Sequence, residues 1–266
     1  MNTTTNLSLS VVLITLNAER TLSQTLTSVS SLADEIVLID SGSTDDTLTT
    51  AKTFGCRVFH RLFDGFGPQK KFAIEQATHD WVLLLDADEA LDPKLQQAIR
   101  ETLTHAPDSH AAFSLPRSLV FMGRPMLHGG ENHRPVVRLF NRQHTHMTNA
   151  LVHETLMTSG PVTSLKGTLW HDSYGSLHDY IGKMNQYTSL NARQSERVGR
   201  RPGPLDVSVR FVFKFLKVYF VKGSILDGLP GFVWAFFSAV YPVLKYTKLY
   251  EQQVGQGYSP SPAMSY

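Results

Sequence analysis

The stretch that most constrains the fold is Trp81–Glu89, in which four aliphatic residues run directly into three closely spaced carboxylates. The aliphatic run does not alternate with polar residues and is too short for an apolar helix, so it predicts a strand buried on both faces. At the end of such a strand Asp86 and Asp88 project on the same side of the chain and repel each other unless a cation compensates. Carboxylate oxygens suit a hard divalent ion, Mg²⁺ or Mn²⁺, which bridges them to substrate phosphates. The alternative is an acidic loop that caps the next helix, because Asp92 and Pro93 have the pattern of a helix start.

Strands and helices alternate through the first half of the chain. Strands are expected at residues 9–15, 35–40, 57–60 and 81–86, and helices at 18–30, from Ser43 or Thr44 onward, and from Pro68 through residue 77. This alternation predicts an α/β fold with a doubly wound, mostly parallel sheet, in which ligands bind beyond the carboxyl ends of the strands. Asn17, Asp40 and the Asp86/Asp88 pair all fall at such ends, so the sequence predicts a single site there.

Charge and small motifs exclude several classes of function. The net charge is only +2, and residues 193–266 hold 10 Lys/Arg against 4 Asp/Glu while the preceding residues hold 15 against 19. A nucleic-acid partner is therefore not expected, although a basic C-terminal surface is. The first loop lacks the glycine fingerprint of dinucleotide enzymes, and a Walker loop is missing. The lone Cys56 suits a reducing cytoplasm, and residues 1–8 lack the pattern of a signal peptide.

Three segments resemble the signatures of family 2 glycosyltransferases, which have the GT-A fold: Thr15–Glu19, Asp40–Asp45 and Asp86–Asp88. Further segments resemble a bacterial subgroup that adds hexoses to the inner core of lipopolysaccharide or to related glycolipids: Gly65–Lys70, Val152–Glu154, His171–Tyr174 and Leu226–Phe232. The resemblance implies a metal-dependent, inverting transfer from a nucleotide-diphospho-sugar, most often a UDP-sugar. Glucose is the sugar that the subgroup suggests.

The resemblance also assigns roles to individual residues. Asp40 matches the residue that hydrogen-bonds the uracil, Asp86 the carboxylate near the ribose and metal, and Asp88 the metal ligand to the diphosphate. Three residues match the segment that wraps the nucleoside: Thr15, Asn17 and Glu19. Lys70 matches a basic residue near the nucleotide, with a helix-surface lysine as the alternative.

An inverting transfer needs a general base that takes the proton of the acceptor hydroxyl. Glu154, which follows His153 after a short apolar segment, is the first candidate. Glu131 and Asp172 are the alternatives. His153 or His171 could complete the metal or diphosphate site, and a purely structural histidine is the alternative for each.

The last third of the chain has a different character. A helix is expected at residues 176–197 and a basic linker at 199–204, followed by an amphipathic helix at 209–222 with Arg210, Lys214 and Lys217 along one stripe. The apolar segment 231–244 is broken by Pro242 and is shorter than the roughly 20 residues that a spanning helix needs. Basic and aromatic residues together predict a helix that lies on an anionic membrane surface. Packing on the catalytic domain or on a second copy is the alternative.

The expected domains are a GT-A catalytic domain at 1–198, with a nucleotide-sugar half at 1–110 and an acceptor half at 111–198, an amphipathic helical extension at 199–254 and a disordered tail at 255–266. The sequence thus predicts a glycosyltransferase that is peripheral on the cytoplasmic face of the inner membrane and acts on a lipid-linked saccharide. A nucleotidyltransferase, which would release diphosphate, and a catalytically silent membrane-binding module are the alternatives.

Overall fold

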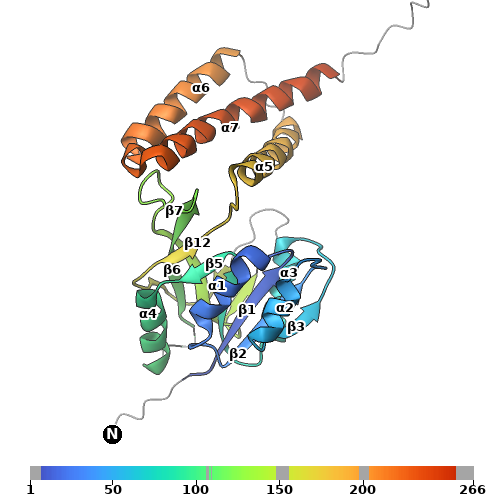
Figure 1. The fold of residues 1–266 in the computed structure, drawn as a ribbon, viewed down its shortest axis with the longest axis vertical. Coiled ribbons are helices and arrows are strands. Elements are labelled where there is room, and N and C mark those ends of the chain that lie inside the picture. Colours follow the sequence, from blue (N-terminus) through green and yellow to red (C-terminus); the bar gives the residue numbers. More distant parts are fainter. Residues whose placement is uncertain (1–6, 106–107, 109, 148–155, 198–203, 256–266) are drawn as a thin grey trace, which may run out of the picture. The chain divides into compact units, whose positions relative to one another are not determined.

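The computed structural model describes residues 7–105, 108, 110–147, 156–197 and 204–255. The chain divides into two units (Figure 1). The first comprises Met1–Val120 and Glu131–Ser173, and the second comprises Phe121–Gly130 and Tyr174–Tyr266.

The first unit is built on a mixed sheet. Its main strands are β1 (Leu9–Thr15), β2 (Glu35–Asp40), β3 (Arg57–His60), β4 (Trp81–Asp86), β5 (Glu89–Leu91), β6 (Ala112–Phe121), β8 (Arg134–Asn141) and β12 (Leu169–His171). They lie in the order β3-β2-β1-β4-β8-β6-β12-β5. The first four in this order are parallel neighbours, and β8 runs antiparallel to both β4 and β6. The predicted mostly parallel sheet is confirmed.

The first unit has three further short strands among its described residues. β11 (Val162–Ser164) pairs parallel with β6, and β9 (Thr145–Met147) pairs antiparallel with β10 (Leu156–Thr158) in a separate sheet.

Helices cover both faces of the sheet, because alternate residues of each buried strand point to opposite sides. The helices are α1 (Glu19–Val29), α2 (Thr47–Thr53), α3 (Phe66–Gln76) and α4 (Pro93–Thr104). Apolar residues of α1 and α4 join one core with Val11, Leu13, Leu83 and Leu85. Ala73 of α3 belongs to a second core with the intervening strand residues, among them Val12, Val37 and Leu84. The sheet is therefore doubly wound, as predicted.

Two helices begin at other residues than the sequence predicts. α2 begins at Thr47, with Asp46 as its N-cap, instead of directly after Ser43 or Thr44. The cause is that the preceding loop is already held by side chains of other segments, described below. α3 begins at Phe66, so Pro68 is its third residue and not its first. α4 begins at Pro93, and Asp92 accepts a hydrogen bond from the backbone N–H of Leu95 at 2.6 Å, as the capping pattern predicts.

The sheet curls back on itself between β4 and β5. Only Ala87 and Asp88 separate these strands in the chain, yet β8, β6 and β12 stand between them in the strand order. Three residue steps span at most about 10 Å, so the far edge of the sheet must return to the end of β4. The acidic turn lies where the curl closes.

The second unit is helical. Besides the short strand β7 (Arg124–Pro125), it contains α5 (Leu177–Arg197), α6 (Pro204–Leu216), a π-helical turn η1 (Lys217–Val221), a 3₁₀ turn η2 (Ser224–Asp227) and α7 (Gly228–Gly255). Asp227 explains part of the motif noted above, because its carboxylate accepts hydrogen bonds from the backbone N–H of His128 at 2.9 Å and from that of Leu127 at 3.1 Å. Gly231 explains another part, since a Cβ there would lie 1.8 Å from the carbonyl oxygen of Ser224.

The prediction that Pro242 breaks the apolar segment is wrong. Pro242 lies inside α7, which is 28 residues long in all. Proline cannot donate to the carbonyl four residues earlier, but it occupies a helical φ and packing on neighbouring helices can offset the lost hydrogen bond. By length and composition, the span Ser224–Gln253 could cross a membrane, with a mean hydropathy of 1.3 and 28% of its most apolar window buried.

Candidate active site

The carboxyl ends of β1, β2 and β4 meet at one edge of the sheet, as the strand pattern predicts. Thr15 pairs with Asp40 in the β1–β2 register, and Ile14 pairs with Asp86 in the β1–β4 register. Because these strands are parallel and adjacent, the loops that follow them converge. The residues that the sequence singles out in the first 90 positions therefore surround a common edge.

Asp40 organises the loop that follows its own strand. Its side chain is almost fully buried, and its carboxylate accepts hydrogen bonds from the backbone N–H groups of Gly42 at 2.9 Å and Ser43 at 3.0 Å and from the Ser43 hydroxyl at 2.5 Å. Burial alone would raise the pKa of Asp40, but these hydrogen bonds and the nearby His60 outweigh it and hold the pKa below its ordinary value.

Asn17 and Glu19 connect the first loop to the second. Asn17 has a left-handed backbone with φ of 51°, and its side-chain oxygen accepts the backbone N–H of Thr44 at 2.9 Å. Glu19 accepts the backbone N–H of Asp46 at 3.1 Å, while its own N–H donates to Asp45 at 3.1 Å. These bonds satisfy the backbone N–H groups of Thr44 and Asp46 without a helical turn, which is why α2 starts later than predicted. The two loops form one hydrogen-bonded layer at the strand ends.

The acidic turn between β4 and β5 is fixed from three directions. The Glu89 carboxylate accepts the backbone N–H of Asp86 at 3.1 Å, and the Thr25 hydroxyl of α1 donates to the Ala87 carbonyl at 3.0 Å. On the other side, the backbone N–H of Asp172 donates to the Asp88 carbonyl at 2.9 Å. These hydrogen bonds to the backbone hold the turn that carries the two aspartates.

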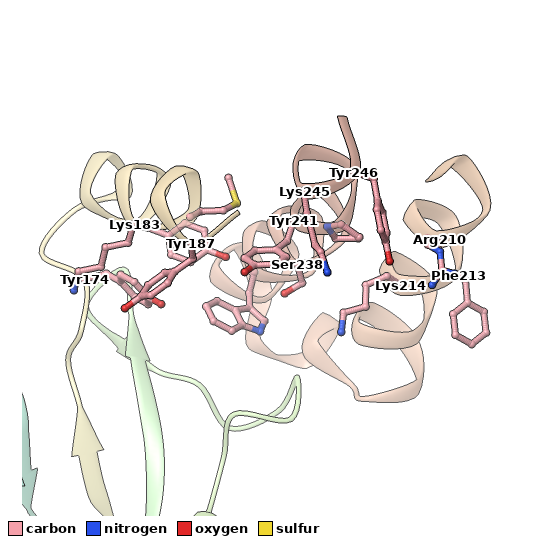
Figure 2. A pocket seen from close by; sticks show the side chains of 14 residues that line it. Tyr174, Lys183, Tyr187, Arg210, Phe213, Lys214, Ser238, Tyr241, Lys245 and Tyr246 are labelled. Carbon is pink, nitrogen blue, oxygen red and sulfur yellow. The ribbon is translucent and has the colours of Figure 1, made fainter. Parts of the chain in front are cut away.

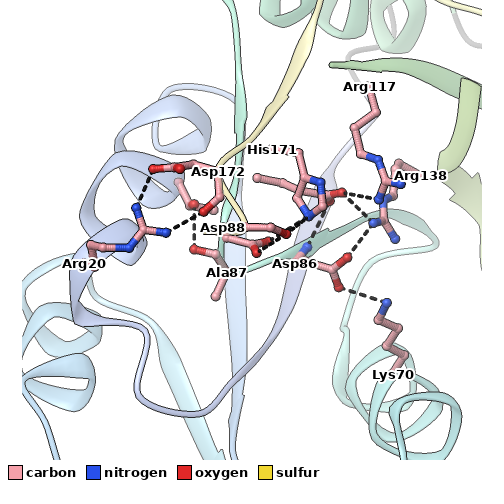
Figure 3. A network of polar contacts seen from close by, with 12 residues as sticks. Arg20, Lys70, Asp86, Ala87, Asp88, Arg117, Arg138, His171 and Asp172 are labelled. Carbon is pink, nitrogen blue, oxygen red and sulfur yellow. Dashed lines mark hydrogen bonds and ion pairs between the residues drawn. The ribbon is translucent and has the colours of Figure 1, made fainter. Parts of the chain in front are cut away.

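Asp86 lies between two basic side chains (Figure 3). One carboxylate oxygen is 2.9 Å from Lys70 Nζ and the other is 2.7 Å from a terminal nitrogen of Arg138. Burial would raise the pKa of Asp86, but the charges of Arg138 and Lys70 outweigh it and lower the pKa well below its ordinary value. Lys70 is itself buried, so it is not a helix-surface lysine.

Arg138 is the residue that sequence reasoning missed. Its terminal nitrogen is 2.7 Å from both Asp86 and the fully buried Glu89, and Arg117 lies 3.4 Å from the same Glu89 oxygen. Burial would lower the pKa of Arg138, but the two carboxylates outweigh it and raise the pKa. One signal was present in the sequence, because a charged residue stands inside the apolar strand Val136–Phe140.

Asp88 has different surroundings. Its carboxylate accepts the Ser173 hydroxyl at 3.1 Å and lies 3.6 Å from His171 Nε2, and that nitrogen is 2.6 Å from the same hydroxyl. Burial raises the pKa of Asp88, and the charges of Asp86 and Glu89 add to this effect while His171 opposes it. His171 is brought here by β12, whose pairing places it directly opposite Glu89 in β5.

The structure describes two of the three candidates for the general base. Glu154 and the neighbouring His153 lie outside the described residues. Asp172 pairs with Arg20 at 2.5 Å, and Glu131 pairs with Arg134 at 3.0 Å.

Among the residues that the structure describes, no group of three or more His, Cys, Asp or Glu side chains is arranged to hold a metal ion. The oxygens of Asp86 are engaged by cations, so within the described part of the chain Asp88 and the adjacent His171 are the donors that remain at this edge. Such a set is incomplete alone, and it fits an ion whose remaining ligands come from a substrate diphosphate and water.

Comparison with known proteins identifies the family. Residues 10–159 match the model of "Glycosyl transferase family 2". The chain is 32% identical over 253 residues to the "Lipopolysaccharide core biosynthesis glycosyltransferase LpsC" of Rhizobium meliloti, covering 92% of this chain and 93% of that protein. It is 28% identical over 253 residues to an uncharacterized glycosyltransferase of Rickettsia typhi, covering 91% of this chain and 87% of that one.

A search of solved structures finds partial likeness to glucosyl-3-phosphoglycerate synthase of Mycobacterium tuberculosis, crystallised with Mn²⁺, UDP and phosphoglyceric acid. The identity is 27%, the TM-score is 0.36, and the likeness covers 42% of this chain and 43% of that one. The family match and the doubly wound, mostly parallel sheet confirm the predicted GT-A fold class, and they decide for a glycosyltransferase over a nucleotidyltransferase. The chain belongs to glycosyltransferase family 2.

Proposed function

We propose that this glycosyltransferase is metal-dependent and inverting, and that it moves a hexose, with glucose as the first candidate, from a UDP-sugar to the inner core of lipopolysaccharide or a related glycolipid. The observation that carries the proposal is the contrast between the two aspartates of the turn. Asp86 is neutralised by Lys70 and Arg138. Asp88 faces His171 and a hydroxyl, neither of which carries a permanent positive charge, beside two further carboxylates.

This contrast suggests different roles for the two aspartates of the acidic motif. Asp88, with His171 as a further donor, would hold Mg²⁺ or Mn²⁺, and Asp86 would stand beside it near the ribose. When bound, the ion would stabilise the negative charge on the departing nucleoside diphosphate. Lys70 and Arg138 keep Asp86 ionised and fixed, so the motif is not forced to share one proton between two adjacent carboxylates.

The nucleoside is expected against the layer formed by the first two loops. Asn17 and Glu19 bind the backbone of residues 44–46, and Thr15 and Asp40 lie side by side where their strands end. A preorganised layer of this kind supports recognition of the uracil by Asp40, because it costs little further ordering when the donor binds.

Transfer then requires one proton movement by the protein. The base takes the proton of the acceptor hydroxyl as its oxygen bonds to the anomeric carbon, and the bond from that carbon to the diphosphate oxygen breaks. Glu154 remains our candidate for the base. Its assignment is supported by the ion pairs of the two alternatives, since Asp172 and Glu131 each hold an arginine.

A lipid-linked acceptor is supported from two sides. The Rhizobium meliloti relative is named for lipopolysaccharide core biosynthesis. The helical unit carries a long apolar helix and basic side chains on α6, which suit a protein that works at the cytoplasmic face of the inner membrane.

A donor assay tests the proposal. The full-length protein is incubated with UDP-glucose, Mn²⁺ and a lipopolysaccharide acceptor, with release of UDP measured and the anomeric configuration of the product read by NMR. Asp88→Asn should abolish turnover and the Mn²⁺-dependent thermal shift caused by UDP, whereas Glu75→Gln, on the exposed side of α3, should change neither. Near-normal turnover of Asp88→Asn, or full activity in EDTA, would refute metal dependence.

A further inference from the structure

The helical unit encloses a cavity between α5, α6 and α7 that the catalytic site does not use (Figure 2). Its volume is about 540 Å³, within the range of about 300–1,000 Å³ that small ligands occupy. Of the 14 side chains that line it, all within the described residues, seven are aromatic, four are basic and none is acidic. The basic ones come from each of the three helices: Lys183, Arg210, Lys214 and Lys245.

Two of these basic side chains contact the same aromatic ring. The Arg210 guanidinium lies 5.5 Å from the centre of the Tyr246 ring, and Lys245 Nζ lies 5.3 Å from the same ring. Across the cavity Lys183 Nζ lies 5.3 Å from the ring of Tyr174. In the described part of the chain neither Arg210 nor Lys245 forms an ion pair with a carboxylate. Two cations held on one ring repel each other, and an anion bound between them would relieve that repulsion.

A neighbouring lysine on α7 shows what a structural role looks like in this unit. Lys248 Nζ is bound by four oxygens of α5, namely the Asn185 carbonyl and side chain, each at 2.6 Å, and the hydroxyls of Thr188 and Ser189, each at 2.8 Å. That lysine joins α7 to α5. Lys245, one turn earlier, contacts a ring and faces the cavity instead, so the helix packing does not account for its charge.

The cavity opens beside an exposed apolar surface. Phe213 lines the cavity and is 65% exposed. Other large apolar side chains on α6, on the turns that follow and at the start of α7 are also exposed, including Val212, Leu216, Phe220, Leu226 and Leu229. Apolar surface of this extent marks a contact with a partner or a membrane. A ligand that uses both features must carry an anionic group and a hydrocarbon part.

We propose that this cavity binds the phosphate headgroup of an anionic membrane lipid, with the acyl chains along the exposed apolar surface of α6. The inference rests on the proposed membrane partner and adds to it a defined headgroup site. A phosphate diester suits the site because guanidinium and ammonium groups are its usual partners, and the tyrosine hydroxyls at the cavity can donate to its oxygens. A free phosphate would leave the apolar surface exposed.

The test compares two pairs of charge-neutralising substitutions in the full chain. Lys183→Gln with Lys245→Gln removes two charges of the cavity, and Lys217→Gln with Lys222→Gln removes two exposed charges outside it. Binding is measured by co-sedimentation with vesicles of phosphatidylglycerol and of phosphatidylcholine. We expect the cavity pair to weaken binding to phosphatidylglycerol at least about tenfold more than the control pair, because diffuse attraction depends only on the number of charges removed.

A third variant addresses shape without altering charge. Ser238→Leu places a larger side chain into the cavity from α7 and should also weaken binding to phosphatidylglycerol vesicles. The thermal midpoint of each variant is measured to confirm that the helical unit is folded. A water-soluble short-chain phosphatidylglycerol should raise the thermal midpoint of the parent, and inorganic phosphate at the same concentration should not.

The outcomes separate the headgroup site from the membrane proposal. Equal losses for the two charge pairs would overturn the site and leave general attraction to anionic membranes intact. An equal thermal shift from inorganic phosphate would show that the ligand is a free anion and would also overturn it. Failure of the parent to sediment with any vesicle would overturn both the site and the proposed membrane partner.

Discussion

Replacing Arg138 by Met should destabilise the first unit strongly, because Arg138 is the shared partner of two carboxylates. Arg138 Nη2 lies 2.7 Å from Asp86 and 2.7 Å from Glu89, and Glu89 has no exposed side-chain surface. Methionine keeps the apolar stem of arginine and nearly its volume while removing the charge. The substitution therefore leaves two carboxylates without their shared partner, and it opens little empty space.

The magnitude follows from what remains. Removing one member of a buried ion pair typically costs about 3–5 kcal/mol, because a charge is left buried and uncompensated. Here Asp86 keeps Lys70 at 2.9 Å, and Glu89 keeps Arg117 at 3.4 Å and the backbone N–H of Asp86. Since each carboxylate retains another partner, we expect the lower end, about 3 kcal/mol. That is a large share of the roughly 5–15 kcal/mol by which domains are stable.

Urea denaturation at neutral pH measures this loss, with Arg134→Met as the matched control. Arg134 pairs with Glu131 at 3.0 Å, but its side chain is 57% exposed. An exposed pair contributes about 0–1 kcal/mol, so the control should change the free energy of unfolding by no more than that. Glu89→Gln and the double variant Arg138→Met/Glu89→Gln complete a cycle, in which the double variant should be more stable than the sum of the single losses predicts.

Two results would refute this reasoning. One is that Arg138→Met lowers the free energy of unfolding no more than Arg134→Met does, which would mean that the network is not buried in solution. The other is strict additivity of the Arg138 and Glu89 losses to within about 0.5 kcal/mol, the behaviour of residues that do not interact.

Four further predictions concern the donor loop, the base and the membrane. Asp40→Asn should weaken UDP-sugar binding by about 1.5–3 kcal/mol in calorimetric titration; unchanged affinity would show that Asp40 serves only its own loop. Because the pKa of Asp40 is lowered in the folded protein, its stabilisation is present above its unfolded pKa of about 4 and is lost as pH falls through the folded value. The stability gap between parent and Asp40→Asn in urea melts should therefore shrink below about pH 4, and a gap independent of pH would contradict this. Glu154→Gln should lower kcat by about 10²–10⁴ with donor affinity retained, and full turnover would move the role to Glu131 or Asp172. A peripheral protein should leave inner membranes in alkaline carbonate, whereas retention would show that α7 spans the bilayer.

The strands around the site were predictable because each signal is local. The predicted limits of β1, β2, β3 and β4 match the observed ones at both ends. The convergence of Asp40 and Asp86 at one edge also followed, since parallel strands place their carboxyl ends together. Local pattern and strand direction were enough for this half of the site.

The partners of these carboxylates were not predictable in the same way. Arg138 stands out as a charge inside an apolar strand, but which carboxylate it meets depends on β8 lying beside β4. Nothing in the spacing of the sequence specifies that strand order. The same holds for Ser173 and His171, which reach Asp88 only because β12 pairs with β5. The helix continues through Pro242 for another reason, because packing of α7 on neighbouring helices offsets the lost hydrogen bond and such packing is not visible in the local sequence.

The return of the sheet to the end of β4 has a consequence for the order in which the molecule forms. Asp86 and Glu89 are three positions apart, but Arg138 comes 52 and 49 positions after them, and Ser173 follows Asp88 by 85. Contacts of such separation form slowly, because long loops must close first. During synthesis β1, β2 and β4 emerge with their carboxylates still lacking these partners, and the charge is compensated only when β8 and β12 arrive. We therefore expect the acidic centre to be the last part of the first unit to assemble. A ribosome-bound chain that ends before β8 should be unable to hold the acidic turn in its folded arrangement.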